Sequence, residues 1–384
     1  MITRNSLNGA FPIKRLGEIV EFLDSQRRPV TESDRRAGPY PYYGANGQQG
    51  TIDDFLFDEP LVLLAEDGGH FGEPDRGIAY RIFGKTWVNN HAHVLRPKPG
   101  VDLAYLCRVL ENYDVTPFVT GTTRGKLTKA GAAQIAVPMP SVVEQRRIAE
   151  VLDRAEALRS IRRAASAQLD TLTQSIFLDL FGDPLSNPKG WTIHQLQEVV
   201  KEGTIVTYGI VQAGEEFPGG VPYIRTGDIV NGEIVTSGLR HTDPAIASKF
   251  SRSRVEAGDI VMSIRATVGT TALVPPELNG ANLTQGTGRI SPGKGTERLY
   301  LLNYLRASGT QHWIRLQIKG ATFREITLSR LRELPVAIPP LPLQREFARR
   351  ITAVEKLKAA HRASLTELDA LFAALQHRAF RGEL

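Results

Sequence analysis

The chain repeats itself, and this repeat constrains its fold more than any other feature of the sequence. Near the start, Phe11–Val20 aligns with Trp191–Val200 at a shift of 180 residues. Farther along the shift is 199, as three matched pairs show: Gly121–Thr128 with Gly320–Thr327, Gln145 with Gln344, and Leu169 with Leu368. So many ordered matches predict two copies of one unit, the second about 19 residues longer in its globular part.

Each copy divides into a globular part and a helical part. The globular parts are rich in Gly and Pro and contain short β-type runs such as Leu61–Ala65 and Asp259–Ile264. The helical parts begin after Pro140 and Pro342, and their apolar residues recur in steps of three and four. This stripe comprises Ile148, Leu152, Ala155, Leu158, Ala165, Leu169, Leu172 and Ile176, then Phe347, Ile351, Val354, Leu357, Leu365, Leu368, Phe372 and Leu375.

These two helices need a partner, because an apolar stripe is unfavourable in water. At roughly 35 residues each they extend about 50 Å. We expect them to pair with each other in one chain, antiparallel, which places the globular parts at opposite ends about an approximate twofold axis. The alternative is that they dimerise two chains.

Composition favours a polyanionic partner and excludes several kinds of site. The formal net charge is +6 and the isoelectric point about 9.4, a mild basic bias. Cys107 is the only cysteine, which excludes an internal disulfide and Cys-rich zinc sites. The start has no signal-peptide pattern and no apolar run is long enough to span a membrane, so we expect a soluble cytoplasmic protein.

Catalytic motifs are incomplete wherever the sequence approaches one. An amino-methyltransferase holds its flipped base with Asn/Asp-Pro-Pro-aromatic, but here Pro276 precedes Glu277 and Pro340 precedes Leu341. The P-loop-like segment Gly288–Gly295 lacks the Ser or Thr that coordinates Mg²⁺. We therefore expect no catalytic residue and no cofactor site in this chain.

Two further features are interpreted as structural. His91 and His93 have same-face spacing on a strand, but no third metal ligand is evident, so we favour a structural or DNA-contacting role and expect no metal site. Asp67 is expected to stabilise the turn before Gly68 and Gly69 through backbone hydrogen bonds.

Several local motifs, in this order and in duplicate, carry a family resemblance. They are Tyr40–Gly47, the Gly-rich turn Ala65–Gly72, and Leu334–Arg345, in which a β-like segment and a proline turn lead into a Gln-Arg helix start. The first copy departs slightly from the last motif, at Pro138–Arg146. The sequence resembles the specificity subunits of type I restriction–modification systems.

The resemblance implies an α+β fold. Two globular α/β target recognition domains, 1–139 and 184–338, would be separated by two long antiparallel helices, 140–183 and 339–384. The helices would form an intramolecular coiled coil, and the whole would have pseudo-twofold symmetry.

The resemblance also implies a function. Such a subunit is not an enzyme; it reads an asymmetric bipartite target in double-stranded DNA. It docks two adenine methyltransferase subunits, which bind S-adenosylmethionine, and through them up to two restriction subunits, which would use ATP and Mg²⁺. Two alternatives stay open: the recognition subunit of a related type II methylase–nuclease system, and a coiled-coil scaffold that does not bind DNA.

Two sets of residues are predicted to carry this function. Polar side chains in Gly-rich loops or at strand ends can reach base edges or phosphates. The candidates for DNA contact are Asn46, Gln48, Asn90, His91, Arg124, Lys126, Arg225, Thr226, Arg265, Gln285, Thr322 and Arg324. The candidates for subunit docking lie on the charged outer face of the first helix: Arg146, Glu150, Arg154, Arg162 and Arg163.

Overall fold

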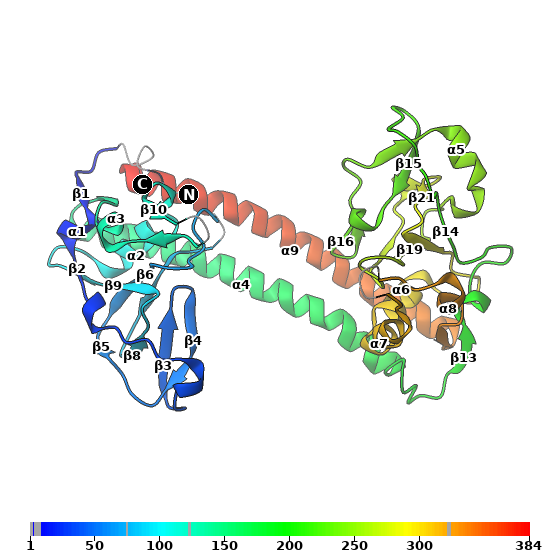
Figure 1. The fold of residues 1–384 in the computed structure, drawn as a ribbon, viewed down its shortest axis with the longest axis horizontal. Coiled ribbons are helices and arrows are strands. Elements are labelled where there is room, and N and C mark those ends of the chain that lie inside the picture. The colour runs from blue at the N-terminus through cyan, green and yellow to red at the C-terminus, as the bar shows by residue number, and fades with distance from the viewer. Residues whose placement is uncertain (1–2, 4–8, 74–75, 122–123, 321–323) are drawn as a thin grey trace. The chain divides into compact units, whose positions relative to one another are not determined.

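The computed structural model describes residues 3, 9–73, 76–121, 124–320 and 324–384 (Figure 1). The chain forms two compact units. Unit 1 runs to Arg163 and takes in Ala363–Leu384, and unit 2 is Ala164–Arg362. Both boundaries fall inside long helices, so each unit holds parts of both. Within the described ranges, no helix has the length and apolar character that crossing a membrane requires.

The described part of unit 1 folds around two four-stranded sheets (Figure 1). One is antiparallel with the order β2-β9-β6-β7: β2 (Val20–Phe22), β9 (Ala92–Pro97), β6 (Leu61–Ala65) and β7 (Ala79–Ile82). The other has the order β4-β3-β8-β5, with β3 and β8 parallel: β4 (Gly47–Ile52), β3 (Tyr40–Gly44), β8 (Lys85–Val88) and β5 (Phe57–Asp58). Shorter elements complete the unit: β1 (Ile13–Arg15), α1 (Leu16–Ile19), α2 (Leu103–Glu111), β10 (Val119–Thr120), β11 (Lys126–Leu127), α3 (Lys129–Ala132) and β12 (Ala136–Pro138).

Strand β6 lies at the centre of unit 1 because both of its faces are apolar. Val62 and Leu64 join the core cluster that includes α2 and the long helices, whereas Leu61 and Leu63 join a second cluster on the other face. All five residues of the strand are buried, as expected for a run of apolar residues without polar alternation. The sheet thus fixes the direction in which the chain leaves β6.

Unit 2 repeats the pairing pattern of unit 1. Its antiparallel sheet has the order β14-β22-β19-β20: β14 (Thr207–Tyr208), β22 (Thr287–Ile290), β19 (Ile260–Ser263) and β20 (Thr271–Leu273). Its mixed sheet has the order β18-β15-β21, with β15 and β21 parallel: β18 (Arg240–Thr242), β15 (Val221–Ile224) and β21 (Asn282–Leu283). The remaining elements are β13 (Thr192–Gln195), β16 (Ile229–Val230), β17 (Glu233–Ile234), α5 (Pro244–Lys249), α6 (Arg298–Arg306), α7 (Ser308–Gln317), α8 (Leu328–Arg332) and β23 (Pro335–Ile338).

The two long helices are α4 (Val142–Phe181) and α9 (Leu341–Arg381), where the sequence predicted helices at 140–183 and 339–384. They contact each other in both units. In unit 1, Arg159 Nε of α4 lies 2.6 Å from Asp369 Oδ1 of α9. In unit 2, Lys358 Nζ of α9 lies 3.0 Å from Asp170 Oδ1 of α4. Because positions later in one helix meet positions earlier in the other, the pairing is antiparallel and within one chain, as predicted.

The ends of the helices are buried. Ile148 and Leu152 at the start of α4 pack in the unit 1 core with Phe372 and Phe380 near the end of α9. The unit 2 core holds the reverse combination, Phe347 and Ile351 of α9 with Phe177 and Phe181 of α4. Complete burial of each such side chain contributes about 1.5–3 kcal/mol.

The prediction that an apolar stripe is buried along each helix is wrong in the middle of the helices. Leu158, Leu172 and Leu357 are 56%, 41% and 48% exposed. The reason is local: each helix end has a globular core beside it, whereas around these leucines the helices are joined by ion pairs such as Arg159–Asp369 and Lys358–Asp170. The recurring spacing therefore identified the helices but not which leucines they bury.

Candidate nucleic-acid interface

In unit 1, predicted DNA-contacting residues gather at the loop that follows β6. Asn46 Nδ2 donates to the carbonyl oxygen of Gly68 at 3.0 Å. Arg124 Nε lies 2.6 Å from Asp67 Oδ1, and His91 Nδ1 lies 3.3 Å from Oδ2 of the same carboxylate. Asp67 was expected to hold its turn through backbone hydrogen bonds, but its carboxylate instead joins side chains from two other segments.

Lys126 joins the same cluster from β11. Its Nζ lies 3.2 Å from Glu66 Oε1, and its side chain is half exposed. The backbone secures this arrangement, because Leu127 N donates to Glu66 O at 2.8 Å and Gly68 N donates to Gly125 O at 3.3 Å. The loop after β6 is thereby hydrogen-bonded to the segment that carries Arg124 and Lys126. The exposed side chains of these two residues form ion pairs with the carboxylates of Asp67 and Glu66.

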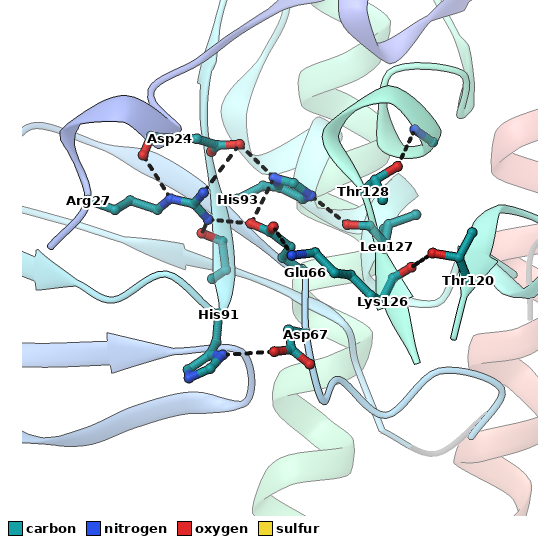
Figure 2. A network of polar contacts seen from close by, with 12 residues as sticks. Asp24, Arg27, Glu66, Asp67, His91, His93, Thr120, Lys126, Leu127 and Thr128 are labelled. Carbon is teal, nitrogen blue, oxygen red and sulfur yellow. Dashed lines mark hydrogen bonds and ion pairs between the residues drawn. The ribbon is translucent and has the colours of Figure 1, made fainter. Parts of the chain in front are cut away.

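A buried polar network lies beside this loop and includes Glu66 (Figure 2). His93 on β9 is fully buried; its Nε2 donates to Leu127 O at 2.8 Å and its Nδ1 lies 2.7 Å from Asp24 Oδ2. Arg27 Nη1 donates to Glu66 Oε2 at 2.6 Å. Burying four ionisable groups is unfavourable unless they neutralise one another, and here two carboxylates face a guanidinium and an imidazole.

The network shifts the titration of Asp24. Burial alone would raise the pKa of this carboxyl, but the hydrogen bond and charge of His93, the Val94 N–H and the charge of Arg27 together lower it below its ordinary value of 3.8. Folding therefore favours the ionised form of Asp24.

Asp24 should therefore contribute to acid sensitivity. Because its pKa is lower in the folded state, its stabilising contribution is fully present above pH 3.8 and is lost as the pH falls through the folded-state pKa. We expect Asp24→Asn to lower the free energy of unfolding most near neutral pH, with the deficit shrinking in acid. Urea unfolding at pH 7, 5 and 3 measures this, with exposed Asp58→Asn as the control. A deficit that grows on acidification would contradict the role assigned to Asp24.

Asp24, Glu66 and His93 also have the ligand types and proximity that a metal ion needs. Their arrangement suits the chain's own cation better. Arg27 already contacts Glu66 Oε2 at 2.6 Å, and the His93–Asp24 contact of 2.7 Å closes the space between those two ligand atoms. His91, which the sequence paired with His93, instead lies against Asp67.

In unit 2, predicted residues gather at the corresponding loop, which follows β19. Arg265 Nε lies 3.1 Å from Glu325 Oε2, and Ala266 N donates to Arg324 O at 3.1 Å. Gly286 lies beside this loop, where an added Cβ would come within 2.8 Å of Thr226 Oγ1 and 4.0 Å of Arg265 Cβ. Gln285, the neighbour of Gly286, is half-buried.

Other predicted residues are placed differently. Arg225 is held beside its own turn, with Nε and Nη2 donating to Asp228 at 3.0 and 2.7 Å. Gln48 on β4 donates to Gly50 O at 3.1 Å, and Asn90 is exposed in the turn before His91. Thr322 lies outside the described residues. Whether any of these residues contacts DNA stays a prediction.

The P-loop-like segment is not a phosphate loop in its observed form. Gly288, Arg289 and Ile290 belong to strand β22, and Arg289 is buried with its Nε 2.7 Å from Asp259 Oδ2. The next helix, α6, begins only at Arg298.

Comparison with known proteins identifies the family. The family model described as "Type I restriction modification DNA specificity domain" matches residues 9–170 and again residues 188–370. The chain belongs to this family. Curated relatives are named as specificity subunits: a putative type I restriction enzyme specificity subunit of Haemophilus influenzae is 28% identical, covering 90% of this chain and 87% of that protein. The EcoBI specificity subunit of Escherichia coli is 26% identical over 65% of this chain and 58% of that protein.

Solved structures agree on the fold. The type I restriction–modification S subunit from M. genitalium matches with a TM-score of 0.60 at 14% identity, covering 97% of this chain and 96% of that one. A chain from a study of complex assembly and conformational transition of the type I restriction–modification system matches with a TM-score of 0.56 at 20% identity, covering 98% of each chain. This specificity subunit is thus a non-catalytic component that works with DNA and other subunits of a restriction–modification system.

The predicted docking residues of this specificity subunit lie on the surface of α4. Arg146, Glu150 and Arg154 line a shallow hollow of about 440 Å³, together with Asp102 and Ala149. Glu150 and Arg154 form an ion pair along the helix.

The last two predicted docking residues lie farther along α4. Arg163 Nη1 lies 3.1 Å from Glu156 Oε1, and its Nη2 lies 3.4 Å from Asp369 Oδ1 of α9. Arg163 therefore also takes part in the pairing of the two helices. Arg162 is half-buried. Docking by the five stays a prediction.

Exposed leucines on the helices are a feature that the sequence analysis missed. Leu158 of α4 and Leu371 of α9 are 56% and 52% exposed in unit 1, and the positions that match them in the repeat, Leu357 and Leu172, are exposed in unit 2. Single exposed apolar side chains are common on protein surfaces, but their exposure at matching positions of both copies makes these leucines candidates for contact with a partner. The signal was present in the stripe, but it was interpreted as packing between the helices.

The sequence analysis also missed the structural role of two buried glutamines. The Gln-Arg sequence was interpreted only as a helix start, yet Gln145 and Gln344 are both fully buried. Gln145 Oε1 accepts from Asp102 N, and its Nε2 donates to Gly100 O and Pro140 O, at 2.8, 3.1 and 3.0 Å. Gln344 makes the same contacts in unit 2 with Glu297 N, Gly295 O and Pro339 O, at 2.8, 3.2 and 2.8 Å. Each glutamine fastens a long helix to the chain segment before α2 or α6.

Proposed function

We propose that this specificity subunit reads an asymmetric bipartite target in double-stranded DNA, with one unit reading each half. The observation that carries the proposal is that two copies of one scaffold present different side chains at corresponding loops. Asp67, Arg124 and Lys126 lie at the loop of unit 1, and Arg265 and Glu325 lie at that of unit 2. Since base edges are distinguished by the donors and acceptors that meet them, different side chains predict different half-sequences.

The two long helices would set the length of the unspecific gap. Each of them contributes to both units without an interruption, since α4 passes Arg163 and α9 passes Arg362 as continuous helices. The ion pairs Arg159–Asp369 and Lys358–Asp170 occupy matching positions of the repeat and hold one register. A spacer of fixed register favours a gap of fixed length.

The chain would dock two methyltransferase subunits, one through each copy of the repeat. Supporting this, exposed leucines occupy matching positions of the repeat: Leu158 and Leu172 on α4 match Leu357 and Leu371 on α9. Catalytic groups and cofactors would belong to the partners: S-adenosylmethionine to the methyltransferase subunits, and ATP with Mg²⁺ to up to two restriction subunits. A subunit that acts on cellular DNA in this assembly would work in the cytoplasm.

The direct test is to express this chain with its methyltransferase partner and map the methylated adenines by modification-sensitive sequencing. We expect one motif made of two different half-sequences separated by a fixed gap. The chain alone should methylate and cleave nothing. A single continuous palindrome, or methylation without sequence preference, would contradict the proposal, and partner binding without salt-dependent DNA affinity would favour a scaffold instead.

A further inference from the structure

The loops after β6 and β19 have the same backbone geometry, which aligns their residues one by one. Leu127 N donates to Glu66 O in unit 1, and Ile326 N donates to Ile264 O in unit 2. Gly68 N donates to Gly125 O, and the equivalent bond runs from Ala266 N to Arg324 O. Between these bonds lie two isolated β-bridges, Asp67 with Lys126 and Arg265 with Glu325. Asp67 therefore corresponds to Arg265, and Lys126 to Glu325.

The charges of this bridge are exchanged between the units. In unit 1 the acidic Asp67 follows β6 and lies opposite the basic Lys126. In unit 2 the basic Arg265 follows β19 and lies opposite the acidic Glu325. Arg265 and Glu325 are each nearly half exposed, at 45% and 44%. In unit 2 the two bridge residues pair with each other, whereas in unit 1 Asp67 pairs with Arg124 and Lys126 pairs with Glu66. The exchange therefore alters what each loop presents to a ligand.

In the described part of each loop, an exposed guanidinium lies with its Nε against a carboxylate. In unit 2, Glu325 on the later segment holds Arg265 at 3.1 Å. In unit 1, Asp67 on the earlier segment holds Arg124 at 2.6 Å, and Arg124 is 60% exposed. Contact at Nε leaves the two Nη groups of each arginine without an ion pair or hydrogen bond to another described residue. A guanidinium that donates twice is the usual partner of guanine O6 and N7.

The backbone beside these arginines is unusual in both units. Gly68 has φ +68° and the equivalent Ala266 has φ +58°. Gly68 adopts this conformation without strain, and an added Cβ would lie 3.0 Å from Arg124 Nη2, so the guanidinium would have to shift. Ala266 adopts the left-handed conformation despite its side chain, and such backbone strain is concentrated at functional sites.

We propose that Arg265 and Arg124 are specificity-determining residues, each recognising a guanine in the half-sequence read by its own unit, with Glu325 and Asp67 as their positioning residues. This inference rests on the proposed function. Arg265 lies on the earlier of the two bridged segments in unit 2, whereas Arg124 lies on the later of the two in unit 1. The two guanines therefore occupy different positions within their half-sequences.

The test uses the complete complex of this chain with its methyltransferase partner, S-adenosylmethionine and a library of DNA targets. Arg265→Lys keeps the charge but removes the forked donor. We expect it to reduce the preference for one guanine, in one half-sequence, by roughly 5- to 150-fold, which corresponds to the usual range for a bidentate contact. Arg124→Lys should do the same in the other half-sequence.

Two further variants separate positioning from folding. Glu325→Gln should weaken the preference at the position that Arg265→Lys affects, while the other half-sequence and the thermal unfolding midpoint stay as in the unaltered chain. Arg252→Lys changes an exposed arginine of unit 2 outside the bridge and should leave the motif unchanged.

The outcomes distinguish this inference from the proposed function. An unchanged motif in Arg265→Lys overturns the inference, as does a uniform loss of methylation with the same motif, which would indicate a phosphate contact. In both cases the proposed function stands. If the unaltered complex shows no bipartite motif, the proposed function itself fails.

Discussion

Replacing Gln145 by leucine is expected to lower the free energy of unfolding by about 3 kcal/mol or more, although leucine is apolar and of similar size. The reason is that Gln145 is fully buried and its side-chain amide forms hydrogen bonds with the backbone N–H of Asp102 and the carbonyl oxygens of Gly100 and Pro140. Each buried backbone group left without a partner costs about 1–3 kcal/mol, and leucine can satisfy none of them.

Urea unfolding of the full chain measures this effect. Gln344→Leu is the matched variant in unit 2, since it removes the same contacts there. Val143→Ala, at a side chain that is 77% exposed beside Gln145, is the control and should change the free energy of unfolding by less than about 0.5 kcal/mol. A loss below about 1 kcal/mol in both glutamine variants would show that the helices are not fastened in this way.

The repeat made the long helices and their pairing predictable. The shift stays at 199 from Gln145, which matches Gln344, to Leu169, which matches Leu368, and this implies two equivalent helices. An apolar stripe on each helix implies a partner. The structure places Arg159–Asp369 and Lys358–Asp170 at matching positions, which is the antiparallel pairing inferred from the sequence. Local spacing suffices for such elements because their contacts repeat along the chain.

The candidate site was predictable only in outline. Glycine-rich turns after apolar runs indicated the loops around Asp67 and Arg265, but not their partners. Asp24 contacts His93 across 69 residues, and Asp67 contacts Arg124 from the segment before β11. Such contacts depend on strand order and register, which short strands do not encode locally.

The exchange of charge between the loops shows the same limit. Asp67 corresponds to Arg265 at a shift of 198 residues, whereas Lys126 corresponds to Glu325 at a shift of 199. In the sequence, the match of Gly121–Thr128 with Gly320–Thr327 places Arg324 opposite Gly125, one position away from Arg124. The backbone hydrogen bonds give the same correspondence, so the two arginines occupy different positions.

Lengthening both long helices by one heptad should lengthen the gap in the DNA target without altering either half-sequence. The insertions would be made beside Ala165 in α4 and beside Ser364 in α9, which are matching positions of the repeat close to the boundaries of the units. Seven residues add about 10 Å of helix, which corresponds to roughly three base pairs of B-DNA. Inserting in both helices preserves the antiparallel register that the ion pairs on either side require.

The central claim is that two units read two half-sequences and that the helices set the distance between them. The most direct measurement is to map the methylated motif of the lengthened complex beside that of the unaltered complex, on DNA in which every gap length is represented. The account predicts two unchanged half-sequences with a longer gap. Altered half-sequences, or an unchanged gap, would contradict it.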